Sequence, residues 1–217
     1  VTKAREKTMT GMGIKRRRLL AAGAALAALG CFSFEAGAQA APEAGAFIES
    51  LADKAVAALT EKNTPREERI RRFRLLLNEH FAVEVIARWV LGQGWRRASE
   101  AEKAEYLGLF EDLIVFSYVD RFTEYAGERL TVFKTLKTEN GDAIVYSIIA
   151  RPNMPEPLEG DWRVRTRDGR YKIVDVMVKG ISMGVTQSQE FASVMNRNNG
   201  SMAGFLGELR ERVRKGA

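Results

Sequence analysis

The feature that most constrains the fold is a change of hydrophobic period near Arg129. From this point apolar and polar residues alternate with a period of two in four successive segments, which is the pattern of β-strands. Asn140-Gly141 and Asp168-Gly169 separate two pairs of these segments, and such dipeptides favour tight hairpin turns. Hairpins join strands that run in opposite directions, so the sequence predicts an antiparallel sheet of about four strands. The segments are 130–138, 142–150, 161–167 and 171–179.

Helical periodicity surrounds this sheet in the sequence. Apolar residues recur at spacings of three and four, which is the pattern of amphipathic helices. Ser99 followed by Glu102 is a capping box that marks the start of the longest helix, and the proline-rich link 151–160 is expected to be an exposed loop. The chain therefore belongs to the α+β class, with a sheet packed against several helices. Helices are expected within 43–60, 63–81, 83–91, 101–126, 181–195 and 201–213.

The helix expected at 101–126 carries more apolar residues than one buried face requires. Its aromatic and aliphatic side chains cover more than one stripe, whereas a helix that packs on one side needs about a third of its circumference. The strand at 142–150 also has apolar residues on both faces. These surplus positions indicate either two tightly packed layers or an apolar pocket between sheet and helices that binds an apolar ligand.

The first forty residues have the three-part layout of a secretory signal peptide. A basic cluster at 15–18 precedes an apolar run at 19–29, and Ala38-Gln39-Ala40 offers the small residues that a signal peptidase recognises. The apolar run is shorter than a membrane-spanning helix, although an N-terminal anchor is the alternative. We therefore expect a cleaved signal peptide at 1–40 and a single exported domain at 41–217.

Other features of this leader leave alternatives open. Arg16-Arg17 followed by leucines fits a twin-arginine signal, so export can follow either the Sec or the twin-arginine route. Cys31 ends a short sequence that is similar to a lipoprotein cleavage box, which would lead to lipidation instead. Translation can begin at Met9 or Met12.

Charge and composition argue against several functional classes. The formal net charge of the chain is +6, but residues 41–217 hold 27 basic and 26 acidic residues. Their net charge is therefore +1, and nucleic acid is not an expected partner. Cys31 is the one cysteine and His80 the one histidine. The mature chain therefore has no disulfide framework or thiolate metal site, and we expect neither a metal nor a cofactor.

Catalytic motifs are missing from the 217 residues, which contain no phosphate-binding glycine loop, HExxH pair or GxSxG elbow. Asp175 draws attention because it is a carboxylate in a strongly apolar strand. It could act with a tyrosine as the acid and base of a small pocket enzyme, or it could accept hydrogen bonds from its surroundings. The second interpretation is favoured, so an enzyme is not expected.

Two blocks of the sequence resemble a known family. The block at 85–127 has a helix that ends in Leu-Gly, a nearby Trp, a capped Ala-Ser turn and a long helix rich in Phe and Tyr. The block at 171–191 has a strand with Asp-Val, then Gly-Ile-Ser, then a helix. Together they are similar to the MlaC family of periplasmic phospholipid-binding proteins, also called the toluene-tolerance family. The resemblance extends over about 45–213, and a branch associated with hopanoid-producing bacteria is also similar.

The resemblance implies a soluble periplasmic carrier of phospholipids. Such a carrier would move lipid between an inner-membrane ABC-type lipid transport complex and an outer-membrane lipoprotein complex. Its acyl chains would lie in the apolar pocket between sheet and helices. Three alternatives stay open, which are a small pocket enzyme, a hopanoid-associated lipid carrier, and a periplasmic adaptor with a fully packed interior.

Periodicity and the resemblance together predict which residues line the pocket. Arg151 is the candidate for a head-group contact. The apolar wall is expected to consist of Phe110, Leu113, Ile114, Tyr118, Val132, Ile144, Tyr146, Ile148, Val174, Val176 and Ile181.

Overall fold

The structure is a computed structural model, and it describes residues 41–152 and 154–216. The predicted signal peptide lies outside the described residues, and so do Cys31 and both candidate start residues. The hypotheses on export, cleavage and lipidation therefore stay predictions.

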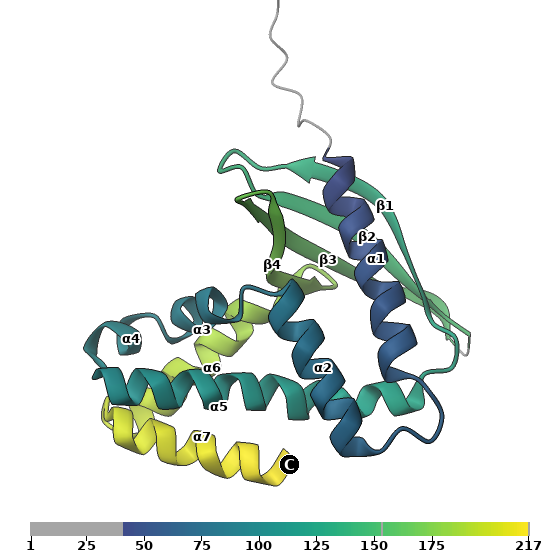
Figure 1. Cartoon of the computed structure of the whole chain (residues 1–217). Coiled ribbons are helices and arrows are strands. Elements are labelled where there is room, and N and C mark those ends of the chain that lie inside the picture. The colour runs from purple at the N-terminus through teal and green to yellow at the C-terminus, as the bar shows by residue number, and fades with distance from the viewer. Residues whose placement is uncertain (1–40, 153, 217) are drawn as a thin grey trace, which may run out of the picture. The chain divides into compact units, whose positions relative to one another are not determined.

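The described residues form an α+β fold, which confirms the predicted class. A five-stranded sheet is accompanied by seven α-helices and one 3-10 helix in this part of the chain (Figure 1). The helices are α1 (Pro42–Leu59), α2 (Arg66–His80), α3 (Val83–Leu91), α4 (Gln93–Arg97), α5 (Glu100–Tyr118), η1 (Val119–Glu124), α6 (Met183–Arg197) and α7 (Met202–Gly216). The strands are β1 (Arg129–Lys137), β2 (Ala143–Arg151), β3 (Met154–Arg167), β4 (Arg170–Val178) and β5 (Ile181–Ser182).

The sheet is antiparallel throughout, and its strands follow the order of the chain from β1 to β5. Gly141 has a φ of 84°, and Asp168 and Gly169 have φ values of 52° and 71°. These are the left-handed values that tight hairpin turns require. The four expected strands are present, and the two-residue β5 adds a fifth.

The prediction that 151–160 forms an exposed loop is wrong, because β3 begins at Met154. Pro155 and Pro157 carry no backbone N–H and would disrupt a strand paired on both sides. They are tolerated because this part of β3 pairs with β2 alone, and pairing with β4 begins only at Gly160, opposite Val178. The first half of β3 is therefore an edge strand that sequence reasoning took for a loop.

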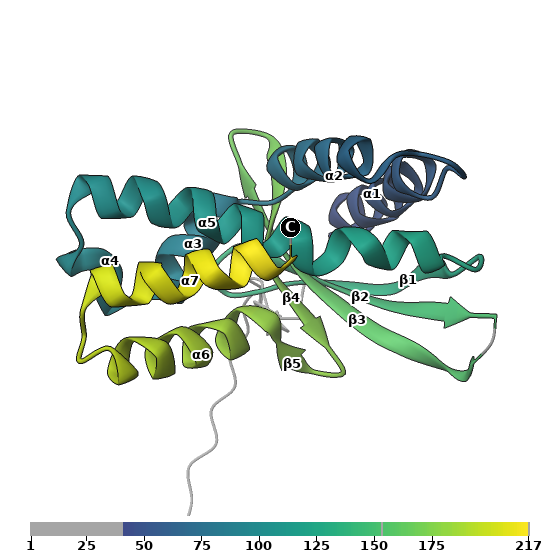
Figure 2. The ribbon, with the colours of Figure 1, turned by 90° about the horizontal axis from the view of Figure 1, so that it is seen from below.

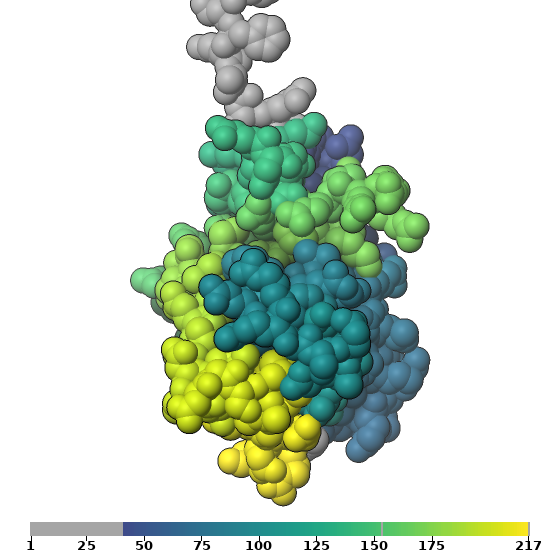
Figure 3. Space-filling model, turned by 90° about the vertical axis from the view of Figure 1, so that its left-hand side faces the viewer, coloured from purple at the N-terminus to yellow at the C-terminus, as the bar shows by residue number. Residues whose placement is uncertain are grey.

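Helices α1 and α2 lie on one side of the sheet, α3 and α6 reach β4, and α4, α5 and α7 extend from them away from the sheet (Figure 2). α1 contacts β1 and β2, whereas α2, α3 and α6 contact β4. Helices from distant parts of the sequence lie side by side in this second group. Figure 3 shows α7, in yellow, beside the blue and teal helices of residues 83–118.

Buried apolar side chains form two separate clusters. The sheet cluster joins α1 to β2, β3 and β4, and the helical cluster joins α3, α5, α6 and α7. The sheet cluster consists of Ala41, Ala44, Ile48, Leu51, Ala143, Val145, Val164 and Ile173. The helical cluster consists of Ala87, Val90, Leu91, Tyr106, Phe110, Phe191, Val194, Met195, Phe205, Leu206 and Leu209. The two clusters share no residue, so the fold has two cores.

Helix α5 explains the surplus apolar residues in its sequence. It begins with the predicted capping box, in which Ser99 Oγ accepts from the N–H of Glu102 and the Glu102 carboxylate accepts from the N–H of Ser99. It ends at Tyr118, earlier than expected, and η1 continues from there. η1 brings Phe122 to Phe73 of α2, with ring centroids 5.8 Å apart. One side of this region therefore packs in the helical cluster and another contacts α2.

Candidate functional site

The face of the sheet that meets α1 is called the inner face below. Residues directly opposite each other in neighbouring strands point to the same face of a sheet. The register that contains Ala143 and Val164 of the sheet cluster therefore defines the inner face. Its members are Leu130, Val132, Thr135, Lys137, Ala143, Val145, Ser147, Ile149, Leu158, Gly160, Trp162, Val164, Ile173, Val176, Val178 and Ile181.

The opposite, outer face carries charged side chains among its apolar ones. Arg163 and Arg165 donate to the carboxylate of Asp142 over 2.7 and 2.8 Å, and Asp142 is 3% exposed. The guanidinium of Arg165, followed by that of Arg163, lowers the pKa of Asp142 against the effect of burial. Burial raises the pKa of Asp161 on the same face. A long apolar ligand therefore meets a more continuous apolar surface on the inner face.

Two small residues occupy the centre of the inner face. Ser147 and Gly160 lie opposite each other in β2 and β3, and both are buried. In the same row across the sheet, Val132 lies opposite Ser147 and Val178 lies opposite Gly160. The row Val132–Ser147–Gly160–Val178, called the trough below, therefore has a low middle between larger side chains.

Two larger side chains lie over the trough. The indole Nε1–H of Trp162 donates to Ser147 Oγ at 3.0 Å, and the Ser147 hydroxyl donates to the carbonyl of Gly160. A Cβ placed on Gly160 would lie 3.7 Å from Cδ1 of Ile149, so Ile149 leans over the glycine. Rotamer changes of these two side chains would uncover the trough, and such changes are among the fast motions of proteins.

Half-buried apolar side chains lie beside the trough and farther along the same face. Each retains some exposed apolar area, and covering that area with an apolar ligand would be favourable. We take the trough and these side chains as the candidate site. Leu130, Ile149, Leu158, Trp162, Val176 and Val178 lie on the strands beside the trough, and Phe47, Leu76 and Phe81 pack against the sheet cluster.

Comparison with known protein families identifies the family of this chain. The sequence profile described as MlaC protein matches residues 49–211. The chain belongs to the MlaC family. This confirms the resemblance found in the two sequence blocks, and the match covers the helical cluster, all five strands and the trough.

A solved structure has the same fold as this MlaC family member. It is the phospholipid-binding protein from Ralstonia solanacearum in complex with a phospholipid. The TM-score is 0.70 and the sequence identity 18%, over 80% of this chain and 98% of that chain. At this identity the likeness establishes the shared architecture, since the match spans almost the entire length of the other protein.

Two of the predicted wall residues lie at the trough of this family member. Val132 is one end of the trough row, and Val176 is next to it, opposite Trp162. Arg151, the predicted head-group contact, follows Ile149 by two residues at the end of β2 and lies opposite Met154. The structure therefore brings Val132 and Val176 to one face and places Arg151 at the end of β2.

Three predicted wall residues lie on the outer face instead. Ile144, Tyr146 and Ile148 alternate with the inner-face residues of β2 and so point away from α1. All three are half-buried, and the ring of Tyr146 lies 6.3 Å from that of Phe133. Their contribution to ligand binding stays a prediction, but it cannot involve the same surface as Val132 and Val176.

Of the other predicted wall residues, Ile181 lies opposite Val178 and so continues the trough row into β5, whereas the remaining five lie elsewhere. Phe110, Leu113 and Ile114 belong to or pack against the helical cluster. Tyr118 ends α5, Val174 lies at a register irregularity of β4, and Ile181 is 64% exposed in β5. No contact of these residues with a ligand is tested by the structure.

Sequence reasoning missed the trough and its covers. Ser147 was the one polar residue in the middle of an apolar strand, and Gly160 was counted with the expected loop. A small residue inside a strand often marks a place where another group approaches closely. That signal, applied to both residues, would have indicated the centre of the inner face.

Asp175 has a structural role in the turn between β4 and α6. Its carboxylate accepts from Ser182 Oγ at 2.6 Å and from the N–H of Gly184 at 3.1 Å, as well as from its neighbour Val176. Gly184 packs so closely against Trp89 that a Cβ there would overlap the indole ring. Asp175 therefore fixes the start of α6 against β4 and α3, as the favoured interpretation of this residue predicted.

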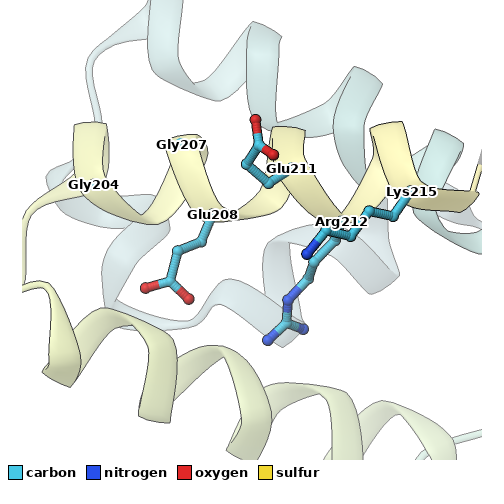
Figure 4. A pocket seen from close by; sticks show the side chains of 6 residues that line it. All are labelled: Gly204, Gly207, Glu208, Glu211, Arg212 and Lys215. Atoms are coloured by element: carbon cyan, nitrogen blue, oxygen red, sulfur yellow. The ribbon is translucent and has the colours of Figure 1, made fainter.

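Two hollows in the described surface are polar and lie elsewhere. One, of about 410 Å³, runs along α7 between Gly204 and Lys215, and Glu208, Glu211 and Arg212 line it (Figure 4). The other, of about 500 Å³, is formed by residues 137–140 at the β1–β2 turn. Neither lies between sheet and helices.

The described ranges 41–152 and 154–216 contain no cluster of His, Cys, Asp and Glu suited to hold a metal ion. In the same ranges, none of the helices combines the length and the hydropathy that a membrane span requires.

Proposed function

We propose that this protein binds a phospholipid by its acyl chains, with the chains crossing the trough in the direction of β2 and lying under α1 and α2. The observation that carries the proposal is the inner face itself. Small residues occupy its centre, two single side chains cover them, and half-buried apolar side chains lie beside them. The family membership and the phospholipid bound by the relative with the same fold support the choice of ligand.

The proposed chemistry needs no catalytic residue. A two-chain lipid hides about thirty methylene groups, and at ~0.8 kcal/mol each their removal from water is worth about 24 kcal/mol. This exceeds the roughly 18–21 kcal/mol at which noncovalent affinities saturate. A bilayer offers a similar gain, so transfer between bilayer and protein is close to balance.

We further propose that the protein is a periplasmic carrier. Because binding alone gives no direction, partners at both membranes must determine where lipid is loaded and released. The partners expected from the family resemblance are an inner-membrane ABC-type complex and an outer-membrane lipoprotein complex. The leader-like sequence at 15–40 supports export to the periplasm.

Filling the trough tests the proposal. In Gly160→Leu the new side chain would occupy the low middle, and the Cβ itself meets only ordinary contacts at 3.7 and 3.8 Å. We expect the variant to fold and to lose at least about tenfold of the phospholipid that co-purifies without detergent, as counted by native mass spectrometry. Ala150→Leu, on the exposed outer face of the same sheet, is the matched control and should retain its lipid.

The alternatives predict other results in these experiments. A packed adaptor would carry no lipid in the unmodified protein, whereas full lipid content in Gly160→Leu would remove the trough from the site. An enzyme that uses Asp175 would lose turnover in Asp175→Asn, whereas a carrier would keep its cargo.

A further inference from the structure

Arg151 has a buried nitrogen that no other group satisfies. Its Nε is out of contact with solvent and has no hydrogen-bond partner within the described residues. Its Nη2 donates to the carbonyl of Glu156 at 3.4 Å, which is near the limit of a hydrogen bond. An unsatisfied buried polar group is costly in a folded protein, and a charged one more so. The buried Nε–H of Arg151 therefore needs an acceptor that the described residues do not supply.

Other half-buried or buried arginines of the described chain are well supplied with acceptors. Arg69 donates to the carbonyls of Leu59 and Thr64. Arg74 pairs with the carboxylates of Glu111 and Asp112 at 2.6 and 2.7 Å. In the described ranges no carboxylate lies within 4.0 Å of a nitrogen of Arg151. Arg151 is thus a cation placed where the protein supplies no anion.

The position of Arg151 indicates where an anion would come from. The residue ends β2 two positions after Ile149, which borders the trough, and the register of β2 with β3 is irregular between these two residues. The opposite end of the inner face is closed, because Ala143, Val164 and Ile173 are buried against α1. The end of β2 and the start of β3 lie at the end of the sheet away from α4 (Figure 2). The polar end of a lipid held in the trough would therefore leave at Arg151.

We propose that Arg151 binds the phosphate of the lipid head group. The inference rests on the proposed function, because it needs acyl chains in the trough. A guanidinium presents several N–H donors in a fixed plane and binds phosphate oxygens through paired, charge-assisted hydrogen bonds. The Nε–H would be one of these donors. The preference that follows is for lipids with a phosphate over neutral lipids with the same chains.

The test compares two lipids that differ in the phosphate group. The full-length protein, stripped of lipid, is incubated with vesicles that contain equal amounts of dioleoylphosphatidylglycerol and dioleoylglycerol, and the bound lipids are measured by mass spectrometry. We expect the phospholipid to be preferred by about tenfold or more, and Arg151→Gln to abolish this preference while it leaves dioleoylglycerol binding unchanged. Arg129→Gln is the matched control, because Arg129 is exposed and lies opposite Ala150, the neighbour of Arg151.

The possible failures are distinguishable. If the unmodified protein binds neither lipid, the proposed function fails. If it binds both lipids and Arg151→Gln has the same preference, or loses both lipids equally, the role of Arg151 is refuted while the proposed function stands. A rise of the unfolding temperature with inorganic phosphate alone, absent in Arg151→Gln, would assign the site to a free anion and overturn the head-group assignment.

Discussion

The helical cluster and the inner face of the sheet are both apolar, but they are packed in different ways. In the helical cluster the ring centroids of Phe191 and Phe205 are 5.1 Å apart, and Tyr106 is fully buried with its hydroxyl donating to the carbonyl of Ala87. Burial raises the pKa of Tyr106 far above its usual value. Edge-on and tilted aromatic contacts of this kind fill space completely.

The centre of the inner face is built from small residues instead. Ser147 and Gly160 stand where larger apolar residues would pack against α1 and α2, and the apolar side chains around them are only half-buried. A chain selected for stability alone would fill such a place, since buried apolar area is the main stabilising contribution. The contrast indicates that the helical cluster mainly stabilises the fold, whereas the inner face binds the ligand. Substitutions that change one property and not the other test this interpretation.

The largest expected effect is the loss of bound lipid when a charge is placed on the inner face of the sheet. The same charge on the outer face should have no such effect. Val176→Arg puts a guanidinium among the apolar side chains of the inner face and should abolish lipid co-purification. Ile148→Arg puts the same group on the outer face and should leave the lipid content unchanged. Native mass spectrometry gives the lipid content, and circular dichroism shows that both variants fold. The opposite pattern would place the ligand on the outer face, as the sequence-based choice of Ile144, Tyr146 and Ile148 requires.

The second prediction concerns the helical cluster. Phe191 is 1% exposed and contacts three other aromatic rings of the cluster. Phe191→Ala should lower the free energy of unfolding by about 3–5 kcal/mol, as measured by urea titration, because it removes apolar contacts and leaves a cavity. The amount of lipid per folded molecule should not change. A loss of lipid from the folded variant would show that the helical cluster, with the predicted wall residue Phe110, belongs to the site.

These comparisons also show what the sequence could and could not predict. The turns at Gly141 and at Asp168-Gly169 depend on local backbone conformation, so the residues in these turns predicted the hairpins correctly. The capping box at Ser99 is equally local. The choice between the two faces of β2 is different, because apolar residues occur on both faces and only the position of α1 makes one of them the inner face.

Periodicity alone could not distinguish the two faces of that strand. Ile144, Tyr146 and Ile148 were predicted for the pocket wall from periodicity and the family resemblance, and α1 covers the side of Val145 and Ser147. Tertiary contacts of this kind are invisible to periodicity. For the same reason the prolines of β3 suggested a loop, although an edge segment without a second partner accepts them.

The third prediction concerns His80, whose protonation should weaken the packing of α1 and α2 on the inner face. His80 is 6% exposed at the end of α2, with its ring 5.7 Å from that of Phe47 in α1. Burial lowers the pKa of His80 below its usual value of 6.5, although Glu79 opposes this, and Lys54 and Lys172 reinforce it. The folded protein therefore favours neutral histidine, and its stability is fully present above about pH 6.5 and decreases as the pH falls below that value.

Unfolding titrations between pH 7.5 and about 5 would measure this dependence. His80→Phe removes the titrating group and should reduce the slope in this range. Equal slopes for both proteins would mean that carboxylates elsewhere cause the acid sensitivity. In terms of the comparison, acid should destabilise the contact of α1 and α2 with the sheet before it affects the helical cluster.

The smallest effect is expected from loosening a single cover of the trough. Trp162→Phe keeps an aromatic ring over the trough but removes the indole N–H that donates to Ser147 Oγ. The lost hydrogen bond should cost about 1 kcal/mol of unfolding free energy, because the hydroxyl of Ser147 still donates to the carbonyl of Gly160. Uptake of a fluorescent phospholipid from vesicles should become severalfold faster if Trp162 must rotate before the chains enter. An unchanged rate with the same loss of stability would show that Trp162 is a fixed part of the wall, and that Ile149 or a movement of α1 controls access instead.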